Sequence, residues 1–412
     1  MPRSNPRQVV LPIFDPRRKD VRSKRPLNVV GLFAGIGGIE LGLRRAGHQT
    51  ALLCEIDLAA QAVLKARLPE TPLHDDITTL GALPKRTDMI VGGFPCQDLS
   101  QAGKTAGIGG TRSGLVGHVF RLIEQQEVPW VLLENVAFML QLGSGRAMEV
   151  IVDRFEQLGY RWAYRVVDSR SFGVPQRRQR VYFLASKEGD PREVLFADDA
   201  GEPKARKVSW NRANGFYWTE GIRGLGWADD AVPTLKGGST VGIPSPPAIV
   251  MPSGDVVTPD IRDIERMQGF EPGWTEPAAG AGRKSFRWKL VGNAVTVDAA
   301  EWIGCRLRQP NKAGTAVEAT PLLLRARWPR AAFNVGDGRF AANVSAWPEH
   351  RERLPLHRWL EYPTALLSER ATAGFLSRTE RAKLKFPEGF IPRLQRHLER
   401  MRGVNRAAAS GG

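Results

Sequence analysis

Apolar runs and amphipathic segments alternate regularly between residues 27 and 186. The apolar runs have the length and composition of buried strands, which we expect at 27–33, 51–55, 88–93, 130–134, 160–168 and 180–185. Between them, apolar residues recur at helical spacing and predict helices at 37–47, 57–67, 114–126 and 146–158. This alternation is typical of a parallel sheet covered by helices on both faces. We therefore predict an α/β fold with a doubly wound, mostly parallel, Rossmann-like domain.

The regular pattern stops after residue 186. The next seventy residues are rich in Gly, Pro, Trp and Arg without a sustained period, which predicts a small, loop-rich domain. Helices resume at about 259–268 and 294–308, and one more is expected near 391–402. The predicted organisation is a basic flexible arm at 1–26, one domain at 27–186 and 258–310, a small domain at 187–257 and a C-terminal extension at 311–412.

Positive charge is concentrated at the two ends of the chain. The net charge is +16; residues 1–26 carry eight Lys and Arg against two acids (+6), and residues 311–412 carry eighteen against nine (+9). The middle of the chain holds only about +1. Basic ends suit a polyanion, because contacts with phosphates release condensed counterions. A solvated basic surface is the alternative explanation.

Several classes of protein are excluded by the sequence. No stretch approaches 18 uninterrupted apolar residues, and the first residues are polar and basic, so neither a membrane span nor a secretory signal is expected. Cys54, Cys96 and Cys305 lie too far apart for a disulfide framework or a zinc knuckle. We expect a cytoplasmic protein with no bound metal.

A glycine-rich turn follows the first predicted strand. In the segment FAGIGG, Gly35 and Gly37 allow a sharp turn and a close approach of backbone to a ligand. Glu55 ends the next strand, where a carboxylate can accept hydrogen bonds from ribose hydroxyls, and Asp76 could reach an adenine amino group. The spacing G-x-G-G favours S-adenosylmethionine over a nicotinamide cofactor, although the turn alone is compatible with either.

One cysteine stands at the end of a central strand. The strand DMIVGG leads directly into Phe94-Pro95-Cys96, and ligands of open α/β sheets bind at this edge. Pro95 restricts the backbone around the cysteine, and the glycine-rich stretch 97–117 has the composition of a lid. Cys96 is therefore the candidate nucleophile. Cys54 and Cys305 are expected to be buried and inert.

Further polar groups are expected at the same edge. Glu134 ends the strand WVLLE and could protonate a ring nitrogen. Strand alternation in QRRQR sends Arg178 and Arg180 to one face, where two guanidinium groups could enter a cleft, unless this is simply a basic edge strand. Asn293 precedes the last core helix and could close the cofactor pocket.

Together these segments resemble the C5-cytosine-specific DNA methyltransferase family. The resemblance covers about residues 28–308, and the motifs occur in the family's order. They are FAGIGG, PCQ, ENV, QRRQR, TPDIRDIERMQGF and GNAV. The resemblance implies an S-adenosylmethionine-dependent methyltransferase fold with a target-recognition domain at 187–257. Amino-methylating enzymes and nicotinamide oxidoreductases do not account for this set.

The family's mechanism gives these residues expected roles. A cytosine is flipped out of duplex DNA, Cys96 attacks its carbon 6, and Glu134 stabilises ring nitrogen 3. Arg180 would contact the cytosine carbonyl with Arg178 in support. The resemblance implies a cofactor site made of Phe33, Gly35, Gly37, Glu55, Ile56, Asp76, Leu115 and Asn293.

The expected partner is double-stranded DNA, bound by a monomer. The predicted DNA contacts are Gln97, Ser100, Arg112, Arg206, Lys207, Arg212 and Arg223; most aromatic residues of the small domain are expected to form its core. The extension 311–412 could hold flanking DNA or stabilise the protein.

By resemblance, we expect a bacterial, nucleoid-associated modification enzyme, with a possible cognate restriction endonuclease acting on the same site. The alternatives are an RNA cytosine-5 methyltransferase and a catalytically silent DNA-binding protein.

Overall fold

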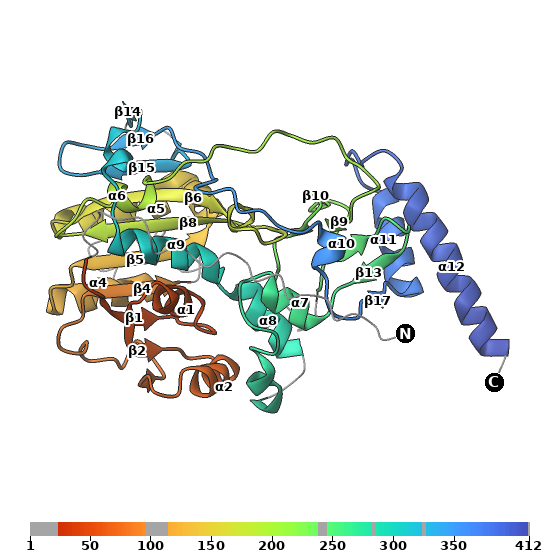
Figure 1. The fold of residues 1–412 in the computed structure, drawn as a ribbon, viewed down its shortest axis with the longest axis horizontal. Coiled ribbons are helices and arrows are strands. Elements are labelled where there is room, and N and C mark those ends of the chain that lie inside the picture. The colour runs from red at the N-terminus through yellow and green to blue at the C-terminus, as the bar shows by residue number, and fades with distance from the viewer. Residues whose placement is uncertain (1–23, 95–113, 238–244, 282–284, 324–326, 411–412) are drawn as a thin grey trace, which may run out of the picture.

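A ten-stranded sheet forms the centre of the larger of two domains (Figure 1). The computed structural model describes residues 24–94, 114–237, 245–281, 285–323 and 327–410. The strand order in this part of the chain is β14-β16-β15-β6-β8-β5-β4-β1-β2-β3. The strands are β1 (Asn28–Leu32), β2 (Gln49–Cys54), β3 (Leu73–His74), β4 (Met89–Gly93), β5 (Trp130–Val136), β6 (Arg161–Asp168), β8 (Gln179–Ser186), β14 (Ala319–Pro321), β15 (Ala331–Asn334) and β16 (Phe340–Ala342).

Half of this sheet is parallel, as the sequence predicts. Strands β3, β2, β1, β4 and β5 pair in parallel. Strand β8, in contrast, runs antiparallel to both β5 and β6. Only residues 169–178 join β6 to β8, which is too short for the crossover that parallel neighbours need. Strands β15 and β14 are likewise reversed, so the sheet is mixed: seven of the described strands share one direction, and β8, β15 and β14 run opposite to them.

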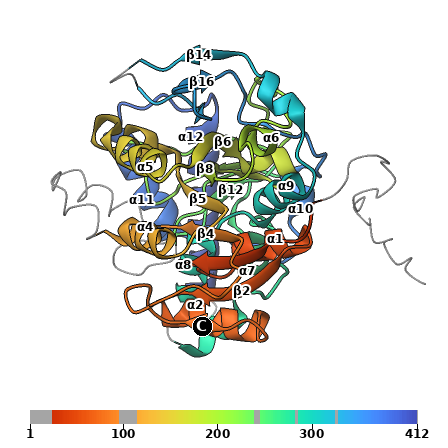
Figure 2. The same ribbon diagram turned by 90° about the vertical axis from the view of Figure 1, so that its left-hand side faces the viewer.

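Helices cover both faces of this sheet (Figure 2). Helices α4 (Leu115–Gln125) and α5 (Arg146–Gln157) bury apolar residues against one face. Helices α1 (Gly38–Arg45), α6 (Arg192–Leu195) and α9 (Val297–Arg308) cover the other. Helix α2 (Leu58–Arg67) follows β2. Gly42 lets α1 and α9 approach closely, since a side chain there would overlap the Val297 carbonyl.

The smaller domain holds a five-stranded sheet with the order β10-β9-β12-β13-β17. Its strands are β9 (Asn214–Phe216), β10 (Ala228–Asp229), β12 (Ala248–Val250), β13 (Val256–Thr258) and β17 (Ala365–Leu366). Two further short strands, β7 (Gln176–Arg177) and β11 (Val232–Pro233), pair in parallel with each other. Strand β7 precedes β8 of the large sheet and β11 follows β10 of the small sheet, so this pair connects the two domains. Helices α7 (Ile261–Arg266) and α8 (Ser285–Asn293) lie between the two sheets in Figure 1.

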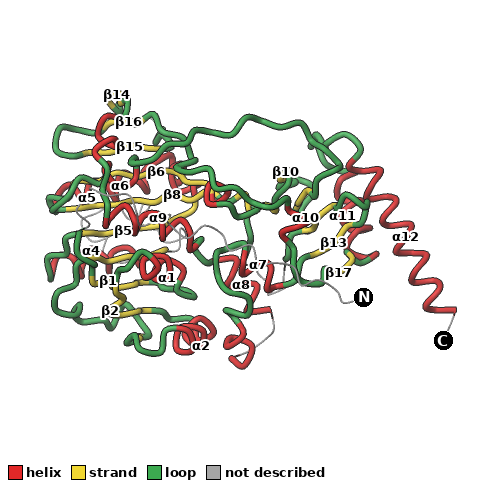
Figure 3. The backbone as a smooth tube through the Cα atoms, in the orientation of Figure 1, coloured by secondary structure: helices red, strands yellow, loops and turns green. Residues whose placement is uncertain are grey.

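The boundary of the small domain differs from the predicted position at 187. Residues of α6 bury Val194 and Leu195 in the core of the large domain. The chain then crosses in an extended loop to reach β9, and a second long segment connects β16 with α10 (Leu356–Trp359) (Figure 3). The sequence placed the start too early because α6 is only four residues long, which leaves no helical period to detect.

The C-terminal hundred residues divide between the two domains. Strand β15 pairs with β6 and continues the large sheet through β16 and β14. Strand β17 then pairs with β13, and helices α11 (Glu369–Glu380) and α12 (Phe390–Ser410) follow. Phe375, Phe390 and Leu394 of these helices are buried against Phe216 of the small sheet. This segment is thus part of both domains, whereas the sequence suggested one separate extension.

The predicted basic arm falls mainly outside the described residues. Its last residues contact the large domain, because the Arg25 guanidinium donates two hydrogen bonds to the Asp88 carboxylate, at 2.5 and 2.9 Å. Within the described residues, no helix has both the length and the apolar character needed to cross a membrane.

Candidate active site

The glycine turn between β1 and α1 has the backbone conformation that glycine permits. Gly35 and Gly37 have φ angles of 56° and 83°, in the left-handed region, and Phe33 has a φ of 55°. A Cβ atom at Gly35 would meet no atom within 4 Å among the described residues, so the turn borders open space. The Trp274 indole stabilises the turn by donating a hydrogen bond to the Ile36 carbonyl, at 2.9 Å.

Glu55 fixes the position of this turn. Its carboxylate accepts hydrogen bonds from the Gly35 backbone N–H, at 2.7 Å, and from the Asp57 backbone N–H, at 2.8 Å. Burial raises the pKa of Glu55, while these backbone donors oppose the shift. The next residue, Ile56, is 69% exposed, which is unusual for an aliphatic side chain and leaves an apolar surface beside the turn.

Asp76 and Leu115 stand at the same edge of the sheet. Asp76 follows β3 and accepts a hydrogen bond from the Thr78 backbone N–H, at 2.8 Å, which lowers its pKa. Leu115 is the first residue of α4 and packs partly buried against the core. Both lie at the carboxyl edge of the parallel strands, where the sequence analysis expected the cofactor.

A single pocket brings together three of the predicted motifs. It contains about 350 Å³ of space free of protein atoms. Its lining includes the glycine turn, Glu134, and the end of α8 at Asn293; the complete set is Phe33, Ala34, Gly35, Gly38, Ile39, Glu40, Gly93, Glu134, Asn293, Ala294 and Val295. Segments more than 250 residues apart in the chain therefore meet in one cavity.

Glu134 and Arg180 form an ion pair at this pocket. The Arg180 Nε atom lies 3.0 Å from Glu134 Oε1, and Glu134 is only 7% exposed. Burial raises the pKa of Glu134, and the positive charges of Arg180 and Arg178 oppose that shift. Oε1 has no well-aligned hydrogen bond among the described residues, so the carboxyl group retains the capacity to bind a ligand.

Arg178 is not among the residues that line this pocket, contrary to the expectation that both guanidinium groups enter a cleft. It is 1% exposed, and it donates hydrogen bonds to the carbonyls of Leu235 (3.2 Å), Gly292 (3.2 Å) and Ala294 (2.6 Å). The Gly292 and Ala294 carbonyls flank Asn293, shortly before α9 begins. Strand alternation did not apply because Arg178 falls between β7 and β8, in neither strand. Arg178 therefore ties the arginine segment to the wall of the pocket.

Cys96, Gln97, Ser100 and Arg112 lie outside the described residues. The described chain leads up to them at Phe94. The Asn135 side chain donates a hydrogen bond to the Phe94 carbonyl, at 2.9 Å, and Gly93 pairs with Glu134 in the sheet register. The end of β4 is thus fixed directly beside the Glu134 carboxyl group.

Comparison with known proteins identifies the family. Residues 27–214 match the family described as C-5 cytosine-specific DNA methylase. The chain is 46% identical over 387 residues to the type II methyltransferase M2.BsuMI of Bacillus subtilis, an alignment that covers 91% of this chain and 99% of the relative. The chain belongs to the C-5 cytosine-specific DNA methylase family.

Other relatives match this methylase over shorter stretches. The type II methyltransferase M.BanI of Aneurinibacillus aneurinilyticus is 37% identical over 175 residues, covering 41% of this chain and 40% of the relative. The solved structure of the Entamoeba histolytica methyltransferase EhMeth is similar in fold, with a TM-score of 0.50 at 14% identity, over 69% of this chain and 98% of that one.

The methylase uses S-adenosylmethionine as its methyl donor, as its family does. The residues of the pocket fit this cofactor. Open space beside Gly35 allows a ligand to approach the backbone. The buried carboxyl groups of Glu40 and Glu134 line the cavity, and no described residue donates a hydrogen bond to Glu40. These features match a ligand that carries both an amino-acid group and a positive charge.

The basic residues predicted to contact DNA have different surroundings in the small domain. Arg206 and Lys207 are exposed on the loop that crosses between the domains. Arg212 pairs internally, because its guanidinium lies 3.0 Å from both carboxylate oxygens of Asp229. As expected, the aromatic residues mainly build the core: Phe216 is fully buried, and Trp210 and Trp218 pack against it.

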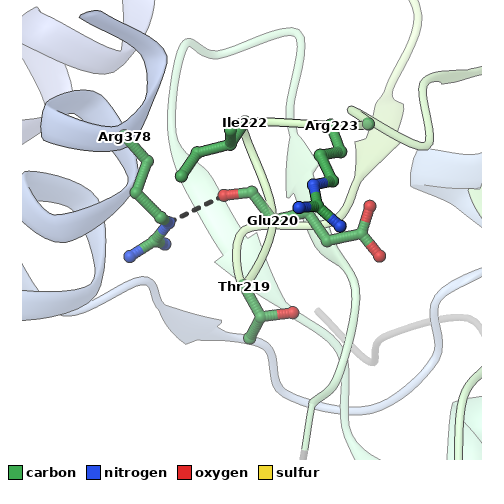
Figure 4. Close-up of a pocket in the computed structure, with 6 residues that line it drawn as sticks. Thr219, Glu220, Ile222, Arg223 and Arg378 are labelled. Atoms are coloured by element: carbon green, nitrogen blue, oxygen red, sulfur yellow. Dashed lines mark hydrogen bonds between the residues drawn. The ribbon is translucent and has the colours of Figure 1, made fainter. Parts of the chain in front are cut away.

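Arg223 is exposed beside an open pocket of the small domain. Figure 4 shows it next to Glu220, with Ile222 and Arg378 on the same loop–helix junction. The Arg378 guanidinium holds this loop by donating hydrogen bonds to the carbonyls of Glu220 (2.8 Å) and Trp218 (2.7 Å). The loop therefore presents Arg223 on a fixed backbone.

Sequence reasoning missed Glu40 as a residue of the pocket. It lies on α1 two residues after Gly38 and is 1% exposed. A signal existed: Glu40 occupies the face of this amphipathic helix that also carries Ile39 and Leu43, where an acidic residue is out of place.

Proposed function

We propose that this methylase modifies one cytosine in a specific duplex DNA sequence, as the modification enzyme of a type II restriction–modification system. The named relatives are type II methyltransferases, which supports this assignment. The observation that carries the catalytic part is the pocket shared by the glycine turn, Glu134 and Asn293. A reacting base and a methyl donor can meet only where both of their sites open into one cavity.

The target cytosine would leave the double helix before it reacts, because its carbon 6 is shielded while the base is stacked. Glu134, held beside Arg180, is positioned to hydrogen-bond the ring at nitrogen 3. Arg180 would contact the carbonyl oxygen of the ring, while Arg178 positions this segment from behind.

Cys96 would supply the nucleophile. It comes three positions after Gly93, so the covalent chain keeps its Cα within roughly 11 Å of the Cα of Gly93, which is paired in register with Glu134. Its thiolate forms a bond to carbon 6 while nitrogen 3 takes a proton from Glu134, which makes carbon 5 nucleophilic. After carbon 5 has been methylated, its proton is lost to water, the thiolate is eliminated from carbon 6, and nitrogen 3 returns its proton to Glu134, which restores the ring.

The cofactor would be held by the backbone of Phe33, Gly35 and Gly37, by Glu55 and Ile56, and by Asp76, Leu115 and Asn293. S-adenosylmethionine supplies the methyl group as an electrophile on its sulfonium sulfur. Glu55 orients the glycine turn through the Gly35 N–H and has lone pairs left for ribose hydroxyls. The exposed Ile56 side chain offers an apolar surface for an adenine ring.

The small domain would read the DNA sequence. Arg206, Lys207 and Arg223 are exposed and available for phosphate or base contacts, whereas the pairing of Arg212 with Asp229 favours a structural role. Bisulfite sequencing of host DNA after expression of the methylase would reveal both the product and the recognised site. Methylation of RNA but not of duplex DNA by the purified protein would contradict this proposal.

The covalent route is tested by Cys96→Ser. We expect a loss of turnover of at least about 10³-fold, because the hydroxyl group is a far weaker nucleophile at neutral pH, with DNA affinity nearly unchanged. Cys305→Ser, on α9, is the matched control and should retain activity. A duplex with 5-fluorocytosine at the target should trap the wild-type protein covalently, because fluorine cannot leave as a proton does. Undiminished turnover in the Cys96 variant would exclude the route.

A further inference from the structure

Glu40 is a buried carboxylate, and the part of the chain that the structure describes places no counter-charge against it. It lines the cofactor pocket from α1 and is 1% exposed. Neither Oε1 nor Oε2 has a hydrogen-bond partner among the described residues. A buried carboxylate that lacks such a partner is strongly destabilising, so its presence in a ligand pocket requires an explanation.

The sheet beneath Glu40 is shaped to receive this side chain. A Cβ atom added to Gly31, in the middle of β1, would overlap Glu40 Oε1 and crowd the rest of the carboxyl group. Glycine is otherwise unfavourable inside a strand, because it adds no packing and loses the most chain entropy. The Gly31–Glu40 pair thus places a carboxylate where a strand side chain would normally lie.

The electrostatic surroundings favour the binding of a cation at this position. Burial, with a smaller contribution from the charge of Glu55, raises the pKa of Glu40 to about 8, although its own backbone N–H opposes the shift. Glu55 also accepts a hydrogen bond from the Gly35 N–H, so a second carboxylate is held at the glycine turn. A cation next to Glu40 would favour the ionised carboxylate, which burial alone disfavours.

S-adenosylmethionine has two cationic centres, the sulfonium sulfur and the α-ammonium group. The ammonium group has three N–H donors, whereas the sulfonium has none, and Glu40 offers two oxygens without partners. We propose that Glu40 binds the α-ammonium group of the methionine part of the cofactor. The proposal rests on the cofactor assignment and does not depend on the Cys96 mechanism.

The test compares S-adenosylhomocysteine with its analogue lacking the α-amino group, by calorimetric titration of the full-length protein. A charge-assisted hydrogen bond in a buried site contributes about 1.5–3 kcal/mol. We therefore expect the wild type to bind the amino-containing ligand roughly 10- to 100-fold more tightly. The isosteric variant Glu40→Gln should reduce this ratio to about 3 or less, within the range of a neutral hydrogen bond.

Ile56→Ala is the control outside the proposed contact. Because Ile56 carries no charge and is assigned to the adenine side, its truncation should weaken both ligands by a similar factor and leave their ratio unchanged. Thermal unfolding of each variant checks that the fold is intact. A wild-type ratio in Glu40→Gln would overturn the proposal and leave Glu40 a structural role.

A second outcome would also overturn it. If Glu40→Gln retains the ratio but loses a preference for S-adenosylmethionine over S-adenosylhomocysteine, the carboxylate contacts the sulfonium instead. Failure of the covalent mechanism would appear differently, as turnover by Cys96→Ser, and would leave the ligand ratio of the wild type unaffected.

Discussion

Three buried charged residues lie in or behind the wall of the pocket, and the charge of each is compensated in a different way. Glu134 has Arg180 at 3.0 Å, and Arg178 has three backbone carbonyls. Glu40 has no partner from another described residue. A group whose charge is unmatched in the free protein stores unfavourable energy that a ligand can release on binding. Glu40 should therefore lower the stability of the cofactor-free methylase.

This effect of Glu40 depends on pH. Its pKa is raised from 4.5 in the unfolded chain to about 8 in the folded protein, so the folded state binds more protons between these values. Stability therefore falls as pH rises through this window. Glu40→Gln does not titrate, so the cofactor-free variant should exceed the wild type in stability above pH 8, by at most about 5 kcal/mol.

Thermal unfolding at pH 5 and pH 8.5 without cofactor measures this difference. The melting temperatures of the two proteins should nearly coincide at pH 5, and the variant should be several degrees higher at pH 8.5. A variant that is less stable at both values would mean that the carboxylate has a partner in the fold.

At the scale of elements, the segment between β7 and β8 joins parts of the methylase that are far apart in sequence. Arg178 reaches from this segment to the carbonyls on both sides of Asn293 and to Leu235. Replacing it with methionine fills much of the same volume. It leaves the carbonyls of Leu235 and Gly292 without a described side-chain donor, and the Ala294 carbonyl with only the 3.3 Å hydrogen bond from Gln268. Such groups are costly because no water replaces the lost hydrogen bonds.

We expect Arg178→Met to lower the free energy of unfolding by about 3 kcal/mol, in the range seen when one partner of a buried charged network is removed. Urea unfolding followed by fluorescence measures the change. Arg161→Met, at the exposed start of β6, is the control and should change stability by less than about 0.5 kcal/mol. Equal stability of the two variants would show that the carbonyls find other donors.

The strands and helices of the large domain could be predicted because each is long and periodic. The observed α1, α4 and α5 begin and end within two residues of the predicted positions. Strands β9 to β17 could not be predicted, because most have only two or three residues and their pairing partners lie far along the chain. Strands β15 and β16, for example, join the large sheet through the pairing of β15 with β6, which lies far earlier in the chain.

The candidate site was predictable to the extent that its residues close strands. Glu55 and Glu134 stand where the strand pattern placed them, at one edge of the sheet. The burial of Arg178 could not be anticipated, because its carbonyl partners come from turns at 235, 292 and 294 that have no periodic signal. Glu40 was missed because a helix pattern shows which face is buried but not which buried residue borders a cavity.

At the scale of the whole molecule, the positive charge of the C-terminal segment needs a test that leaves the fold intact. Deleting 311–412 would remove β15 from the large sheet and α11 and α12 from the core of the small domain. The exposed cluster Arg381, Lys383 and Lys385, between α11 and α12, can instead be changed to glutamine without disturbing either core.

We expect this triple substitution to weaken DNA binding and to flatten the dependence of log K on log salt concentration by up to about 2.7, or 0.9 per phosphate contact. Binding to duplex DNA at several salt concentrations measures the slope. The control changes three exposed basic residues of the large domain, Arg44, Lys65 and Lys85. The same slope in both variants and the wild type would leave the segment only a stabilising role.

The division of the final segment between both sheets has a consequence for synthesis. All the motifs of the candidate site precede residues 319–342 and 365–394 in the chain, yet without these residues each sheet lacks a neighbour at one edge. Since chains fold as they are synthesised, the growing chain has two open sheet edges until these residues are added. We therefore expect a stop codon before residue 319 to yield an insoluble product, although all the motifs of the candidate site are encoded upstream of it.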